Sequence, residues 1–169
     1  MSCKGGGYSM QRLIRMVAGT ALVALLACAA AATSAPDPVL GGWILNVAKS
    51  KFGSTPTPTS QLRTYTQTPD GMEVIVKGES AEGESAVFES TFKYDGKDYA
   101  ASGNPDFDTI AVRRINDYVT KSVLKRAGKV VGHLTREVSK DGKTLTLTEA
   151  LRNAKGAWVN EALVYDKER

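Results

Sequence analysis

Hydrophobic and polar residues alternate along most of the chain after residue 40, and turn signals interrupt this alternation at intervals. Met72, Val74 and Val76 share one face of a segment whose Glu73 and Lys77 occupy the other, which is the period of two typical of a half-buried β-strand. Similar patterns predict strands over residues 41–47, 62–68, 72–77, 84–94, 98–101, 109–115, 118–126, 129–138, 144–151 and 157–165.

The segments between these strands have the composition of turns. Pro69-Asp70-Gly71, Asp95-Gly96 and Asp141-Gly142 are sequences that favour tight turns. About ten short strands at a spacing of roughly 10–12 residues are typical of an all-β sandwich or barrel. Because a meander leaves two open edges unless it closes, we predict an antiparallel up-and-down meander of about ten short strands closed into a small barrel.

The first 35 residues have a different pattern. Arg12 and Arg15 precede an uncharged apolar run, residues 16–32, which ends in Ala30-Ala31-Ala32. A basic start, an apolar centre and a small-residue cleavage site are typical of a secretory signal peptide. We therefore predict a signal peptide over residues 1–35, a barrel domain over residues 36–169, and a periplasmic or secreted location. The alternative is a lipoprotein, in which residues 25–28 act as a lipobox and Cys28 carries the lipid.

Charge excludes one class of partner. The 169-residue chain has 22 Lys and Arg against 18 Asp and Glu, a net charge of +4. Lys4, Arg12 and Arg15 belong to the predicted signal, so the mature domain has 19 cations and a net charge of +1. Nucleic-acid binding needs a clustered basic surface, and no segment concentrates one. We predict no nucleic-acid partner.

Cysteine and histidine are too few for most metal and catalytic sites. Cys3 and Cys28 are the only cysteines, and both precede the barrel domain, so we predict no disulfide or thiol site there. His133, the only histidine, lies in a strand and is expected to be a packed or surface residue. We predict no metal and no cofactor.

An outer-membrane barrel is a competing all-β interpretation. It would need a strand face free of charge towards lipid. In the strand over residues 118–126, Lys121 shares a face with Val123, and Arg126 shares the other with Leu124. The water-soluble barrel is therefore favoured, with no membrane span in the mature chain.

Several segments resemble a known superfamily. The opening GGWILNVAKSKF and the close LVYDKE resemble those of the lipocalin and fatty-acid-binding-protein superfamily. KYDGKDY, GNPDFDT and VSKDGKTLTLT make the chain similar to uncharacterised bacterial secreted lipocalin-like proteins. The resemblance implies a closed lipocalin-like barrel that holds small apolar or amphipathic ligands inside. Leu163 and Glu149 stand where fatty-acid binders place two buried arginines, so the resemblance does not carry over those ligand contacts.

Counting residues back from two predicted hairpin turns places two arginines in one row across neighbouring strands. If Asn116-Asp117 and Ala127-Gly128 are two-residue turns, then Arg114, Val119 and Arg136 lie side by side on neighbouring strands, with Lys121 on the same face. Two arginines about 9–10 Å apart could hold one anionic group between them. We predict that Arg114, Lys121 and Arg136 bind ligand inside the barrel. The alternative is a solvated basic stripe on the outside.

The two tryptophans have a structural interpretation. Trp43 follows Gly42 at the start of the first strand, where a large aromatic residue could close the end of the core. Trp158 lies in the last strand, which a closed barrel pairs with the first. We predict a structural Trp43–Trp158 cluster at one end of the barrel.

Two groups of oxygen-bearing side chains are candidates for metal binding or catalysis. Asn104, Asp106 and Asp108 offer oxygen ligands for Ca²⁺, but they are also ordinary turn formers, and we expect a structural turn. Glu149 and Glu161 are the only candidates for a pair of catalytic carboxylates, and two carboxylates alone are not evidence of catalysis. We predict a small-molecule-binding protein and not an enzyme. The alternative is a non-catalytic structural or protein-interaction module of the cell envelope whose barrel is filled by its own side chains.

Overall fold

The computed structural model describes residues 35–53, 57–80, 82–152 and 156–169. The predicted signal peptide, Cys28 included, lies outside the described residues except for Ala35. Within the described ranges, no helix has the length and apolar character needed to cross a membrane.

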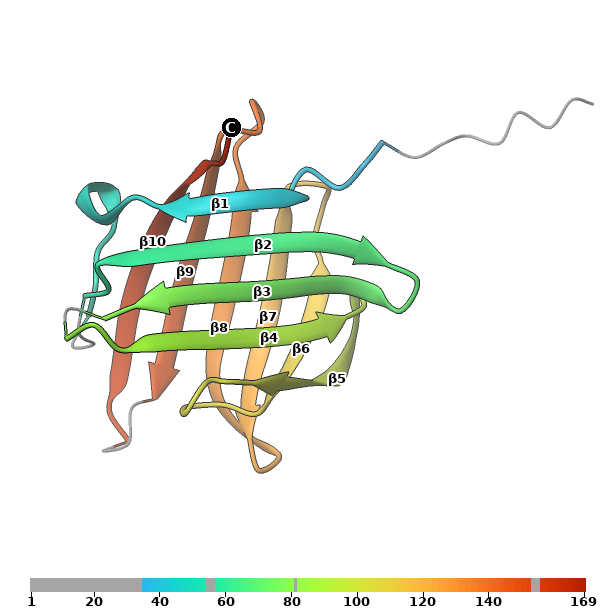
Figure 1. Ribbon diagram of the computed structural model, residues 1–169. Coiled ribbons are helices and arrows are strands. Elements are labelled where there is room, and N and C mark those ends of the chain that lie inside the picture. Colours follow the sequence, from blue (N-terminus) through green and yellow to red (C-terminus); the bar gives the residue numbers. More distant parts are fainter. Residues whose placement is uncertain (1–34, 54–56, 81, 153–155) are drawn as a thin grey trace, which may run out of the picture. The chain divides into compact units, whose positions relative to one another are not determined.

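The described domain is an all-β barrel of ten antiparallel strands, which confirms the predicted fold class (Figure 1). Neighbours along the chain pair with each other, and the first strand pairs with the last, so the sheet closes on itself. The strands are β1 (Gly41–Leu45), β2 (Ser60–Thr68), β3 (Gly71–Glu79), β4 (Ser85–Phe92), β5 (Asp95–Ser102), β6 (Thr109–Arg114), β7 (Val119–Arg126), β8 (Lys129–Val138), β9 (Thr144–Arg152) and β10 (Trp158–Lys167).

One turn follows the prediction and another does not. Ala127 and Gly128 both have positive φ, 48° and 75°, as a two-residue hairpin turn between twisted strands requires. The Asn116-Asp117 turn is longer than predicted, because the Asn116 Oδ1 atom accepts hydrogen bonds from the backbone N–H groups of Tyr118 and Val119, each at 2.9 Å. This local bonding of an Asn side chain sets β7 one residue later against β6.

The barrel has two ends, which the meander defines. The turns after β2, β4, β6 and β8 lie at one end, together with residues 35–40, which precede β1 and which we name the strap. Val39 of the strap is fully buried, and its carbonyl accepts a 2.7 Å hydrogen bond from the Trp43 Nε1–H. The connections after β1, β3, β5, β7 and β9 lie at the opposite end.

The predicted tryptophan cluster is wrong. Trp43 is fully buried, as a residue that closes the core should be, but its β10 partner is Lys167, whose Nζ lies 4.1 Å from the indole centroid. Trp158 is nine residues away along β10, which is about 30 Å of strand, and it is 47% exposed beside Arg152. The sequence indicates that β1 pairs with β10, but not that β1 pairs with the C-terminal end of β10, at Tyr165–Lys167.

The core fills much of the barrel interior. Alternate residues of each strand point inwards and bury apolar side chains against one another, as the period-two pattern predicted. Tyr165 of β10 is fully buried in this core, and its hydroxyl donates a hydrogen bond to the Gln61 side chain of β2. These contacts hold the two ends of the chain in one closed sheet.

Candidate functional site

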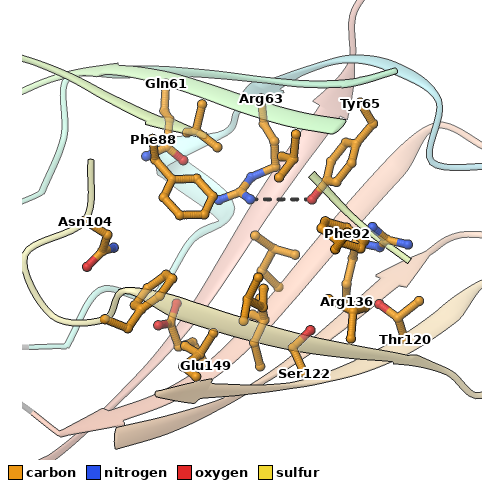
Figure 2. Close-up of a pocket in the computed structure, with 18 residues that line it drawn as sticks. Gln61, Arg63, Tyr65, Phe88, Phe92, Asn104, Thr120, Ser122, Arg136 and Glu149 are labelled. Carbon is orange, nitrogen blue, oxygen red and sulfur yellow. Dashed lines mark hydrogen bonds between the residues drawn. The ribbon is translucent and has the colours of Figure 1, made fainter. Parts of the chain in front are cut away.

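A cavity of about 130 Å³ lies inside the barrel (Figure 2). Ten of its lining residues are apolar and eight are polar or charged. The apolar residues are Val74, Val76, Phe88, Phe92, Phe107, Ile110, Val112, Leu124, Leu134 and Leu147. The polar and charged ones are Gln61, Arg63, Tyr65, Asn104, Thr120, Ser122, Arg136 and Glu149.

Two arginines face this cavity, the buried Arg136 of β8 and the half-buried Arg63 of β2. Arg63 of β2 donates a 3.4 Å hydrogen bond from Nη1 to the Tyr65 hydroxyl, which Figure 2 shows as a dashed line. Arg136 of β8 is 5% exposed, and its guanidinium carbon lies 5.0 Å from the centroid of the Tyr65 ring. Tyr65 therefore contacts both cations.

Both arginines have an unsatisfied donor. The Nε atoms of Arg63 and Arg136 are buried and have no hydrogen-bond partner among the described residues. A buried donor of a charged group without a partner costs more than the roughly 1–3 kcal/mol of a neutral one. Burial opposes ionisation of the Tyr65 hydroxyl, but the two cations outweigh it and lower its pKa. This part of the cavity therefore favours negative charge.

The predicted anion seat between Arg114 and Arg136 is built differently from the expectation. Both arginines do lie beside Thr120 on the inner face of the sheet. Arg114, however, pairs with Asp37 of the strap and does not line the cavity. The Tyr94 hydroxyl donates to Asp37 at 2.8 Å and accepts from Arg136 Nη2 at 2.9 Å. The chain's own carboxylate thus satisfies Arg114, and the ligand-binding role of Arg114 and Arg136 stays a prediction.

The placement of Lys121 was wrong. Lys121 is exposed on the outer face of β7, opposite Arg113 and Thr135, and Thr120 takes the inward position expected for Val119. The longer turn before β7 and an irregularity at Leu124/Lys125 each change the register by one residue. Because the two changes are opposite, Arg114 and Arg136 still lie on either side of one β7 residue. That residue is Thr120 and not Val119, since a one-residue change of register moves the β7 side chains to the other face.

The cavity becomes acidic towards the end opposite the strap. Glu149 of β9 lines it, and Glu161 of β10 is its direct cross-strand partner on the inner face. Burial raises the pKa of Glu149 to about 7, helped by the charges of Glu161 and Asp106 and opposed by that of Arg63. Burial also raises the pKa of Glu161, against a hydrogen bond from the Gly53 N–H.

The loop after β5 closes this end by side-chain packing. Phe107 is 7% exposed and packs edge-on against Phe88, with ring centroids 5.6 Å apart. The Asn104 side chain accepts the Asp106 N–H at 2.8 Å, and the Asp108 carboxylate accepts the Ala127 N–H at 2.9 Å. Two of the three oxygen-bearing side chains suited to Ca²⁺, those of Asn104 and Asp108, thus accept backbone hydrogen bonds. The described part of the chain holds no group of three or more His, Cys, Asp or Glu side chains able to bind a metal.

Sequence reasoning missed Arg63, although a signal for it was present. The Pro69-Asp70-Gly71 turn leads into the strand whose Val74 and Val76 share one face in the sequence pattern. The structure pairs Arg63 with Val76 across this hairpin, so extending the register through the turn would have placed Arg63 on the buried face. The polar neighbours of Arg63 along β2 hid this position in the hydrophobicity pattern.

Comparison with known proteins gave similarity to solved barrel structures only. No family model matches the chain, and no curated protein matches it. The chain is similar to the zebrafish ileal bile acid-binding protein in complex with cholic acid, with 13% identity, a TM-score of 0.48, and coverage of 78% of this chain and 99% of the other. It is also similar to the siderocalin Ex-FABP, described as having dual ligand specificities, with 12% identity, a TM-score of 0.38, and coverage of 78% and 71%.

Proposed function

We propose that this chain is a non-catalytic binding protein that holds a small amphipathic anion inside its barrel. The observation that carries this proposal is the pair of buried, unpartnered Nε donors, on Arg63 and Arg136, in a cavity with otherwise largely apolar lining. A carboxylate accepts such donors well, because its two oxygens match the planar guanidinium fork. The apolar walls would take the hydrocarbon part of the same molecule.

The volume of the cavity limits the size of the ligand that it can hold. A volume of about 130 Å³ is below the roughly 300–1,000 Å³ of sites for drug-sized ligands, and it is close to the about 150 Å³ of an apolar cavity that binds benzene. Butyrate has as many non-hydrogen atoms as benzene. We therefore propose a short-chain or similarly small carboxylate as the ligand, and not a long-chain fatty acid.

The test is an NMR titration of the ¹⁵N-labelled barrel domain with butyrate and with butyramide, its neutral counterpart of the same size. Charge-assisted hydrogen bonds contribute roughly 1.5–3 kcal/mol, so butyrate should bind at least about tenfold more tightly than butyramide. Arg136→Gln should remove this preference. Lys121→Gln is the matched control, because it removes the same charge from the outer face. Equal binding of the two compounds, or no shifts around the cavity, would contradict the proposal.

A self-filled structural module remains the second candidate, and the Asp37–Arg114 pair favours it. In this pair the chain's own Asp37 carboxylate binds Arg114, an arginine that the sequence predicts to bind a ligand. Under this alternative the residual cavity holds no ligand. Native mass spectrometry of protein purified from its own host separates the two, since only a binding protein should carry a small molecule with it.

The pattern of residues 1–35 supports a periplasmic or secreted location as part of this proposal. Intact-mass analysis of the protein expressed in its own host should give a mature chain that begins close to Ala35. A chain that keeps its apolar run would contradict this location, and a lipid mass on Cys28 would indicate the lipoprotein alternative.

A further inference from the structure

Glu149 is a half-buried acid in the wall of the cavity. It lines the cavity at the end opposite the strap, where Figure 2 shows its carboxylate beside the apolar lining. Among the described residues, no hydrogen bond or ion pair involves its side chain. An ionised carboxylate in such a place is costly unless it is paired.

The titratable groups around Glu149 come from three parts of the barrel. Arg63 of β2 favours its ionised form, whereas Glu161 of β10 and Asp106 of the loop after β5 oppose it. Tyr165 of β10 is near enough for the Glu149 charge to raise the pKa of its hydroxyl. On β8, the residue paired with Glu149 is the apolar Leu134. In the described part of the chain, Arg63 is thus the cation that acts on Glu149, and it is also one of the two arginines with a free buried donor.

We propose that Glu149 competes with the ligand anion for Arg63, so that the cavity takes up a small carboxylate together with a proton and releases both as the pH rises. This inference rests on the proposed function, and it adds the regulation of the same site. With Glu149 ionised, its charge partly neutralises Arg63 inside the cavity. With Glu149 protonated, the two cavity arginines face the ligand without that internal competitor.

Linkage fixes the direction of this effect. A bound anion places a second negative charge near Glu149, so it favours the protonated form and raises the pKa of Glu149 above the value of about 7 in the ligand-free protein. Binding the anion therefore draws in a proton, and by reciprocity protonation must strengthen binding. Between about pH 6 and about pH 8 the protonated fraction of a group with that pKa falls about tenfold, and the affinity falls by up to the same factor.

The experiment measures butyrate affinity at about pH 6 and about pH 8 by NMR titration, with wild type, Glu149→Gln and Glu137→Gln. Butyrate is almost fully ionised at both pH values, so its own titration contributes little. Wild type and Glu137→Gln, whose altered side chain is exposed on β8, should bind up to about tenfold more tightly at about pH 6. Glu149→Gln should bind butyrate at both pH values with the affinity that wild type has at about pH 6. This variant has no carboxylate at position 149 that could compete with butyrate for Arg63.

A second measurement follows the proton itself. The ¹³C shift of the Glu149 carboxyl should titrate at a higher pH when butyrate is bound than when it is absent. If wild type binds butyrate with the same affinity at both pH values, the proton linkage is wrong but the binding function stands. If butyrate binds at neither pH, the proposed function itself fails.

Discussion

The unpaired Glu149 carboxyl should make the folded barrel less stable in mild base than in mild acid. The pKa of Glu149 in the folded chain is about 7, against 4.5 for an ordinary Glu, chiefly because of burial. The folded chain therefore holds more protons than the unfolded chain between these two values. The free energy of unfolding must fall as pH rises through this window.

The magnitude follows from the same difference. Each pKa unit corresponds to about 1.4 kcal/mol, so the separation between 4.5 and about 7 gives an upper limit of about 3 kcal/mol. The Glu149 residue is partly exposed, and solvent reduces such costs, so we expect about 2 kcal/mol. The stabilising contribution is complete below the unfolded-state pKa and is lost once pH exceeds the folded-state value.

Urea denaturation of wild type and Glu149→Gln from about pH 5 to about pH 8 measures this effect. The variant should be only slightly more stable than wild type near pH 5, and about 2 kcal/mol more stable near pH 8. Glu137→Gln, which removes an exposed carboxylate from the outer face of β8, serves as the control and should keep the wild-type pH dependence. Parallel curves for wild type and Glu149→Gln would show that this acid is not destabilised by burial.

Two further predictions concern the strap and one tight turn. Asp37→Asn should destabilise the barrel by about 2–3 kcal/mol near neutral pH, because it removes the anion that pairs with Arg114. Burial disfavours the Asp37 charge, but hydrogen bonds and Arg114 outweigh this effect and lower the pKa of Asp37. The difference in stability between wild type and Asp37→Asn should therefore be present above pH 3.8 and shrink below it in acid denaturation curves. Gly103→Ala should cost more than about 3 kcal/mol in urea unfolding, because at φ 82° its Cβ would lie 1.8 Å from the Val87 carbonyl oxygen. Gly128→Ala, with φ 75° and no described atom within 4 Å of the new Cβ, should cost only about 1–2 kcal/mol, and equal losses would contradict the steric argument.

Local chemistry was enough to predict most of the fold. The period-two pattern of Met72, Val74 and Val76 and the turn at Ala127-Gly128 depend only on near neighbours, and the structure confirms both. Strand pairing followed because a meander pairs each strand with the next. The closed barrel followed from the need to remove two open edges.

The sequence alone determined that this chain forms ten short strands and that their inner face is largely apolar, because both properties are written in residues one or two positions apart. Only the tertiary structure decided which polar groups face the interior. A bulge and a side-chain-bonded turn moved Lys121 outwards, and the closing register between β1 and β10 separated Trp158 from Trp43. It also brought Asp37 to Arg114 across 77 positions of the chain. Register and long-range charge pairing depend on how all the strands close together, and no local pattern contains that information.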